Sequence, residues 1–154
     1  MELTPRRAAR LLVYDSSRGC VLLFQYEDDG RRWWVPPGGG LEGDETFEEA
    51  AVREAAEELA VSSRTLLPLW HSIAEFSFRG TGFRQEEWYF LLRVPAGAVT
   101  LGEEVREAHR HEGVVATRWR TLDEIEATSE QVVPEDLPRR LRDLRLAVTS
   151  AEGL

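Results

Sequence analysis

The sequence contains no lysine. All 19 of its basic residues are arginines, against 28 aspartates and glutamates, so the formal net charge is −9. Nonspecific binding to a nucleic-acid backbone depends on many cationic side chains that release counterions from the phosphates, and we expect none here. An acidic chain can still act on a phosphate compound when a metal ion lies between the carboxylates and the phosphates. The charge therefore points to a bound metal if the substrate carries phosphate.

Cysteine and long apolar runs are also scarce. Cys20 is the only cysteine, which excludes an intrachain disulfide, and its place in an apolar run predicts a buried side chain. No apolar run approaches the length of about eighteen residues that a membrane-spanning helix needs. The N-terminal segment has arginines but no apolar segment that ends in a cleavage site. These absences predict a cytoplasmic protein with no membrane partner.

The size and composition fit one folded unit. The chain has 154 residues, of which 42% are hydrophobic, enough to bury a core in a single domain spanning residues 1–154. A homodimer is compatible with this sequence.

Strand-like and helix-like segments alternate along the chain. Short apolar runs predict strands, and apolar residues at intervals of three or four predict helices. A mixture of this kind predicts a layered α/β unit. The expected strands are 8–15, 19–27, 66–78, 86–94 and 113–119, the expected helices are 46–59, 121–127 and 135–151, and segments 33–45 and 95–112 are expected to lack regular structure.

The helix 46–59 has a defined beginning and an acidic face. Thr46 and Glu49 form a capping-box pattern, in which each side chain accepts a backbone N–H of the other residue. Spacings of three and four residues bring Glu54, Glu57 and Glu58 to one side of the helix. Like charges at these spacings destabilise a helix by about 0.2–0.5 kcal/mol per pair unless something offsets them.

Two interpretations of this acidic face remain open. It is either a solvated surface with ion pairs to Arg53, or a site for a cation. The alanines on the other faces would let the helix pack closely on a sheet, and the preceding glycine-rich turn can bring backbone carbonyls near a cation. Oxygen ligands suit Mg²⁺, with Mn²⁺ as a possible substitute.

The segment from Gly39 to Val61 resembles the Nudix box, G-x5-E-x7-R-E-U-x-E-E-x-G-U, where U is aliphatic. The spacing matches throughout, and six of the seven fixed identities are present. Ala60 replaces the last glycine, at a helix end where glycine often adopts the left-handed conformation, so the form of this cap is open. Ala55 stands where a larger aliphatic residue is usual.

The resemblance implies a Nudix-like α/β/α sandwich with a mixed β-sheet. It also implies metal-dependent hydrolysis of a nucleoside diphosphate linked to another group X, by attack of water at phosphorus. By the same resemblance Glu54, Glu57 and Glu58 bind the metal, with a backbone carbonyl near Gly39 as a further ligand. Glu45 and Arg53 would orient those ligands through hydrogen bonds.

The resemblance does not fix the catalytic base. Glu54 serves in some members of the family, and others use a glutamate from a loop nearer the C-terminus. Glu112, just before the expected strand 113–119, is our leading candidate for such a base or an added metal ligand, ahead of three acids in the preceding loop. The nearby motif "AHRHE" could also be a zinc cluster, but no cysteine or second cluster joins it. The acids ranked below Glu112 are Glu103, Glu104 and Glu107.

The sequence gives only weak signals for the residues that would bind the base or the group X of the substrate. Trp33 and Trp34 are neighbours that would point to opposite faces of a strand, so at most one of them faces a cleft. Trp33 as a stacking surface and Arg84 as a phosphate contact are the expected substrate-binding residues, with Arg79 as an alternative. Two other functions remain open for the chain, a Nudix-like domain that binds a nucleotide without cleaving it, and an isomerase acting on a diphosphate ester, for which no cysteine near the expected cleft is evident.

Overall fold

The computed structural model of the chain describes residues 2–62, 66–95, 97, 99 and 101–152. It contains seven strands and four helices within these residues. In chain order they are β1 (Thr4–Asp15), β2 (Cys20–Asp28), β3 (Arg31–Val35), β4 (Gly38–Gly40), α1 (Phe47–Leu59), β5 (Leu67–Phe78), β6 (Thr81–Arg93), α2 (Glu103–His111), β7 (Val114–Thr121), α3 (Leu122–Ala127) and α4 (Leu137–Glu152).

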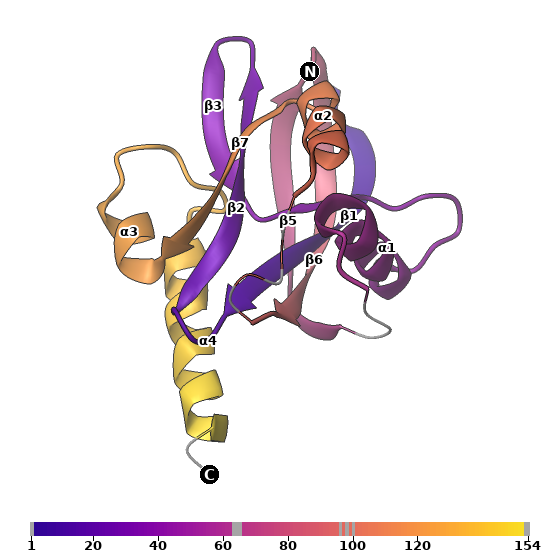
Figure 1. Cartoon of the computed structure of the whole chain (residues 1–154). Coiled ribbons are helices and arrows are strands. Elements are labelled where there is room, and N and C mark those ends of the chain that lie inside the picture. The colour runs from indigo at the N-terminus through magenta and orange to yellow at the C-terminus, as the bar shows by residue number, and fades with distance from the viewer. Residues whose placement is uncertain (1, 63–65, 96, 98, 100, 153–154) are drawn as a thin grey trace.

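The strands form one mixed sheet with helices on both faces (Figure 1). The order is β3-β2-β1-β6-β5, with β4 paired to β1 and β7 paired to β2. Among the paired strands of the described residues, β1 and β6 run parallel and the other pairs are antiparallel. This arrangement confirms the predicted α/β class and the mixed sheet.

The central strands β1 and β2 separate soon after their hairpin. They pair only at Tyr14–Val21 and Asp15–Cys20. Farther from the turn, Ala8–Arg10 of β1 pair with β4, while β2 pairs with β3 and β7. Side chains from both separated strands line one large cavity, so the divergence of the hairpin opens the site described below.

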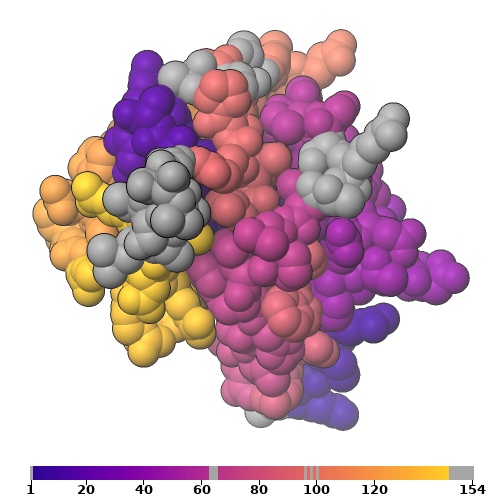
Figure 2. Space-filling model, turned by 90° about the horizontal axis from the view of Figure 1, so that it is seen from below, coloured from indigo at the N-terminus to yellow at the C-terminus, as the bar shows by residue number. Residues whose placement is uncertain are grey.

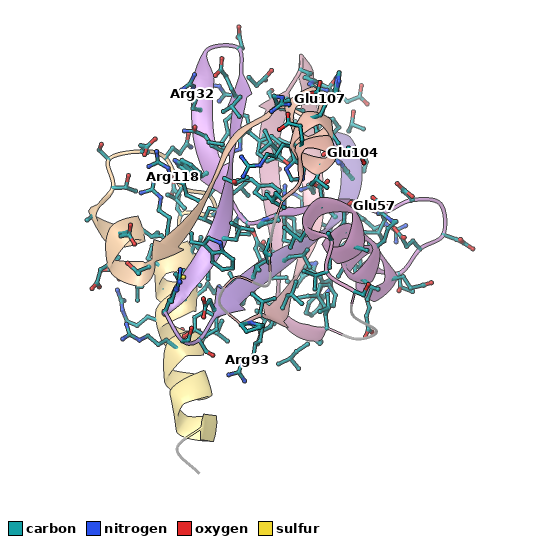
Figure 3. The ribbon with its side chains drawn as sticks, viewed as in Figure 1. Arg32, Glu57, Arg93, Glu104, Glu107 and Arg118 are labelled. Carbon is teal, nitrogen blue, oxygen red and sulfur yellow. The ribbon has the colours of Figure 1, made fainter. Side chains whose placement is uncertain are left out.

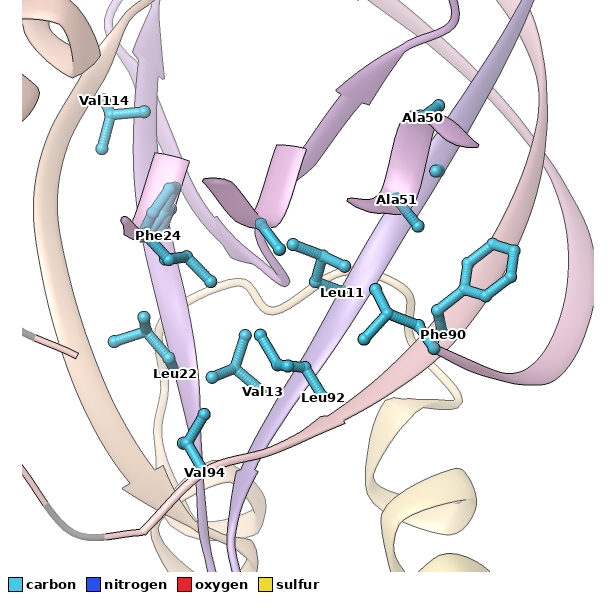
Figure 4. Packing of buried hydrophobic residues seen from close by; sticks show 14 residues of the cluster. Leu11, Val13, Leu22, Phe24, Ala50, Ala51, Phe90, Leu92, Val94 and Val114 are labelled. Atoms are coloured by element: carbon cyan, nitrogen blue, oxygen red, sulfur yellow. The ribbon is translucent and has the colours of Figure 1, made fainter. Parts of the chain in front are cut away.

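Alternation along β1 divides the core into two clusters. Leu11 and Val13 point to the α1 side and pack with the small residues Ala50 and Ala51 of that helix (Figure 4). Leu12 and Tyr14 belong to the cluster on the other face, which also holds Leu137 and Leu141 of α4. Seen from below, α4 and the purple segments around α1 lie at opposite sides of the molecule (Figure 2). Because strand side chains alternate between faces, one strand supplies both layers.

The sequence correctly predicted the helices α1 and α3 and the longer strands. Thr46 caps α1 and forms the expected capping box with Glu49. Cys20 is buried, as expected. None of the described helices is long and apolar enough to cross a membrane.

Two segments expected to lack regular structure contain it. β3 and β4 lie within or at the edge of 33–45, and α2 lies within 95–112. The turn Asp29–Gly30, with positive φ at both residues, joins β2 to β3 and is a hairpin signal that the apolar pattern did not reveal. Of the residues in α2 only His109 is buried, so that helix has no apolar stripe from which to predict it.

Ala60 ends α1 in the left-handed conformation, with φ 56° and ψ 33°. The N–H groups of Ala60 and Val61 donate to the carbonyls of Ala56 and Ala55, at 3.1 and 3.0 Å. A residue with a Cβ is strained in this conformation, whereas glycine adopts it readily. The position that departs from the sequence motif therefore keeps the backbone geometry that glycine favours.

We predict that Ala60→Gly stabilises the protein by about 0.5–1 kcal/mol, because relief of strain at Ala60 outweighs the extra freedom glycine gives the unfolded chain. The matched control is Ala56→Gly, on an exposed position inside the same helix, which should destabilise by about 1 kcal/mol. Equilibrium unfolding in urea, followed by circular dichroism, measures both. Equal losses of stability in the two variants would contradict the prediction.

Candidate active site

Arg53 joins the loop before α1 to the acidic face of that helix. Its Nε and Nη2 donate to both carboxylate oxygens of Glu45, at 2.8 and 2.9 Å, and Nη2 also donates to the carbonyl of Gly40 at 2.9 Å. Its Nη1 donates to Glu54 at 3.0 Å and to Glu57 at 3.1 Å. The pKa of Glu45 is lowered, first by its hydrogen bond from Arg53. Arg53 and Glu45 thus have the geometry that the orienting role requires.

Glu54 is buried against the glycine turn. A Cβ added to Gly39 would lie 2.4 Å from Oε1 of Glu54, so only glycine leaves room for this carboxylate. Oε1 accepts the bond from Arg53, but Oε2 is buried without a hydrogen-bond partner among the described residues. Burial, and then the charge of Glu58, raise the pKa of Glu54 to about 7. An ionised Glu54 therefore needs a further positive partner.

Glu58 lies one turn along, beside a second acidic side chain. It is 8% exposed, and Nε2 of the buried His109 lies 2.6 Å from its Oε2, although not in line for a hydrogen bond. Glu112, at the C-terminal cap of α2, is largely open to solvent. The pKa of Glu112 is raised to about 7, first by partial desolvation and then by the charge and hydrogen bond of Glu58. Glu54, Glu58 and Glu112 all line one cavity.

Glu57 differs from the other two acids of the α1 face. Figure 3 shows it on α1, and its side chain is 57% exposed and paired with Arg53 at 3.1 Å. It does not line the cavity. Glu103 and Glu107 of α2 pair with Arg110, and His111 is exposed, so the zinc cluster considered for "AHRHE" has no support in this arrangement.

The cavity has a volume of about 700 Å³. Trp33 lines it, while Trp34 is 2% exposed and packs in the core on the α4 side, which confirms that only one of the two tryptophans faces the cleft. Tyr26 stacks with Trp33 at 6.0 Å between ring centroids, and the Arg31 guanidinium lies 5.7 Å from the Trp33 ring centroid. Arg84 is exposed, pairs with Glu75 at 3.1 Å, and is not among the lining residues.

Several polar residues of the cavity were not singled out in the sequence. They are Arg6 and Arg10 on β1 and Gln85 and Glu87 on β6, whereas Arg79, the alternative phosphate contact of the sequence analysis, also lines the cavity. Gln85 and Glu87 are two positions apart and Arg6 and Arg10 four, and both spacings put side chains on the same face of a strand. That spacing was readable, but only the parallel pairing of β1 with β6 brings the two pairs together.

The described residues contain no group of three or more His, Cys, Asp or Glu side chains already arranged to hold a metal ion. The donor set nevertheless fits a hard divalent cation, because carboxylate oxygens are its preferred ligands and Oε2 of Glu54 is buried without a partner. The Glu54 carboxylate lies directly against the backbone of Gly39, so the carbonyl of that residue is near the same point. Glu54, Glu58, Glu112 and the carbonyl of Gly39 are the groups available to such an ion.

Comparisons with known proteins agree with this geometry. A family model described as the NUDIX domain matches residues 4–141. The RNA pyrophosphohydrolase of Acidiphilium cryptum (strain JF-5) is 32% identical, in an alignment that covers 73% of each chain.

Solved structures at lower identity share the fold. The E. coli dihydroneopterin triphosphate pyrophosphohydrolase is 19% identical, with a TM-score of 0.68 over 95% of this chain and 99% of that one. The C. elegans Ap4A hydrolase is 21% identical, with a TM-score of 0.60 over 94% and 99% of the two chains. Together with the family match and the curated relative, they lead to one assignment. The chain belongs to the Nudix family, and it is a hydrolase of phosphorus anhydride bonds.

Proposed function

We propose that the chain, as a single domain of residues 1–154, is a metal-dependent pyrophosphohydrolase that cleaves a nucleoside diphosphate linked to another group X. The observation that carries this proposal is the crowding of Glu54, Glu58 and Glu112 along one cavity, where the charge of Glu58 acts on both other acids and Oε2 of Glu54 is unpaired among the described residues. Such crowding is unfavourable for the free protein and becomes favourable when a cation binds.

In this proposal Glu54, Glu58 and the carbonyl of Gly39 hold Mg²⁺, for which Mn²⁺ can substitute. Glu57 can join them only by leaving its ion pair with Arg53, since its side chain does not line the cavity. A bound divalent ion would neutralise phosphate oxygens and lower the pKa of a bound water. Arg53 is held by Glu45 and in turn fixes the position of the Glu54 carboxylate through a hydrogen bond.

Glu112 acts in the proposal as the base that takes a proton from the attacking water onto its carboxylate. It caps α2 and is therefore carried by a different element from Glu54 and Glu58. A base on a separate element can approach the substrate after the phosphates are bound. Its pKa of about 7 lies near neutral pH, where a general base works best.

The activities of related proteins support a phosphoanhydride substrate. The names of the Acidiphilium cryptum RNA pyrophosphohydrolase and the C. elegans Ap4A hydrolase both describe nucleotide compounds. The test is a panel of nucleoside diphosphate derivatives, dinucleoside polyphosphates and triphosphate-ended RNA, incubated with Mg²⁺ or Mn²⁺ and analysed for products. Tight binding without cleavage would instead identify a nucleotide-binding domain.

We predict that Glu58→Gln lowers the rate on the best substrate about 100-fold or more, because a charged metal ligand is lost while the side chain keeps its size. Glu48→Gln, an exposed position on the same helix, is the matched control and should stay within about twofold. Excess chelator should abolish wild-type turnover. Near-normal rates for Glu58→Gln, or full turnover in verified absence of metal, would refute the proposed metal site.

Glu112→Gln separates a base from a metal ligand. A base predicts a maximal rate that falls about 100-fold or more at saturating substrate and is not restored by added Mg²⁺. A ligand predicts a raised Mg²⁺ requirement that added metal partly rescues. The measurement is the rate across a Mg²⁺ titration, and wild-type behaviour throughout would remove Glu112 from the site.

The raised pKa of Glu54 predicts a pH dependence of stability in the metal-free protein. The folded-state pKa of Glu54, about 7, lies above the ordinary value of 4.5. The contribution of this group to the free energy of unfolding is therefore present at low pH and lost as pH rises through 7. Wild type should therefore lose more stability between about pH 5.5 and pH 8 than Glu54→Gln does. Urea unfolding in chelator at several pH values measures this, and parallel pH profiles for the two proteins would contradict it.

A further inference from the structure

Three polar residues on neighbouring strands, Arg10, Gln85 and Glu87, line the cavity together and are here called the polar floor. The parallel pairing of β1 and β6 sets Ala8 beside Glu87, and the pairing of β5 with β6 sets Ala74 beside Gln85. All five residues line the cavity. Ala8 and Ala74 are small and leave space beside Glu87 and Gln85, while Arg6 of β1 lies opposite Gln85.

The hydrogen bonds of the polar floor fix the orientation of the Gln85 amide. Nε2 of Gln85 donates to Oε2 of Glu87 at 2.7 Å, and Nε of Arg10 donates to the same oxygen at 3.0 Å. A carboxylate only accepts, so the Gln85 amide must present its nitrogen to Glu87 and its oxygen elsewhere. Oε1 of Gln85 is buried without a partner in the described part of the chain.

The polar floor is therefore incompletely satisfied. Gln85 is 1% exposed and Glu87 5% exposed, and both bonds to Glu87 fall on one of its two oxygens. An unpaired buried acceptor destabilises a fold unless a ligand supplies a donor. Two acceptors and a guanidinium side by side suit a ligand that supplies two N–H donors next to a carbonyl.

Resting on the proposed function, we infer that the polar floor binds the base of the substrate, and that this base has the 2-amino-oxo-pyrimidine edge of guanine. The N1–H and 2-amino groups of guanine would donate to Glu87 and Gln85, and its O6 would accept from Arg10. Arginine to guanine O6 and carboxylate to ring amino groups are pairings of matched donors and acceptors.

Other common bases fit the polar floor less well. Adenine carries one amino group flanked by ring nitrogens that are acceptors, and these would face the carboxylate and amide oxygens. Uracil has one N–H between two carbonyls. A buried acceptor left opposite another acceptor is unfavourable, which makes the discrimination strong. A reduced pterin carries the same edge as guanine, so the two ligand sources share one chemistry.

Nucleoside binding in the presence of chelator tests the inference without phosphates or metal. We expect guanosine to bind about 10- to 100-fold more tightly than adenosine, with inosine, which lacks the 2-amino group, between them. Calorimetry or the quenching of tryptophan fluorescence measures each affinity. Neopterin is included to distinguish a pterin from a guanine ligand. The compound of the two, neopterin or guanosine, that binds more tightly identifies the class of ligand.

Variants assign the preference to the polar floor. Gln85→Leu and Glu87→Gln should each reduce the guanosine-to-adenosine ratio about tenfold or more. Glu86→Gln, on the neighbouring position of β6 where the side chain pairs with His71 outside the cavity, is the matched control and should keep the ratio. Circular dichroism establishes that each variant is folded. Because Gln85→Leu removes no charge, it tests the inference even if Glu87→Gln fails to fold.

The outcomes distinguish this inference from the proposed function. Equal affinities for guanosine, inosine and adenosine, or no binding of any nucleoside at about 1 mM, would overturn the inference and leave the pyrophosphohydrolase proposal standing. A guanosine preference that is lost in Gln85→Leu supports it. The same preference in a protein that cleaves nothing in the substrate panel would sustain the inference and refute the proposed hydrolysis.

Discussion

The guanidinium of Arg53 is the interaction on which the site depends. It holds both oxygens of Glu45, the carbonyl of Gly40 and one oxygen each of Glu54 and Glu57. These contacts raise the pKa of Arg53 further, so it remains charged. One positive charge cannot balance all the acids around it. Arg53 thereby fixes the loop before α1 to that helix. A deficit of positive charge remains beside Glu54 and Glu58.

The sheet brings that deficit and the polar floor to the same cavity. The separation of β1 from β2 allows β4 to pair with β1, and the φ of Gly38 is 150°, where an added Cβ would lie 2.2 Å from the carbonyl oxygen of Ala9. The glycine turn can therefore lie tightly against β1. The same strand carries Arg10 toward the cavity. Phosphate chemistry and base recognition can thus share one cavity because β1 supports both.

Local patterns in the sequence predicted the local parts of the site well. The capping box of Thr46 and Glu49 fixes where α1 begins, and the helical spacing then fixes the relative directions of the glutamates. The helical spacing did not reveal that Glu57 turns toward Arg53 and solvent while Glu54 and Glu58 are buried. Burial depends on which part of the helix contacts the sheet.

Features that depend on distant pairing were beyond local patterns. α2 has almost no buried residue, so nothing in its periodicity marks the helix that carries His109 and Glu112. The polar floor needs the register between β1 and β6, strands separated by more than sixty residues of chain. The hairpin turn Asp29–Gly30 was readable and would have predicted β3, and hence the strand that brings Trp33 to the cavity.

In the proposed site Glu54, positioned by Arg53, and the neighbouring Glu58 hold a divalent cation. The most direct measurement is anomalous X-ray diffraction from crystals of the protein grown with Mn²⁺. We expect a manganese peak in contact with the carboxylates of Glu54 and Glu58 and the carbonyl of Gly39, with Arg53 still bonded to Glu45. A peak confined to other acidic residues, in crystals of a protein that is active with Mn²⁺, would contradict it.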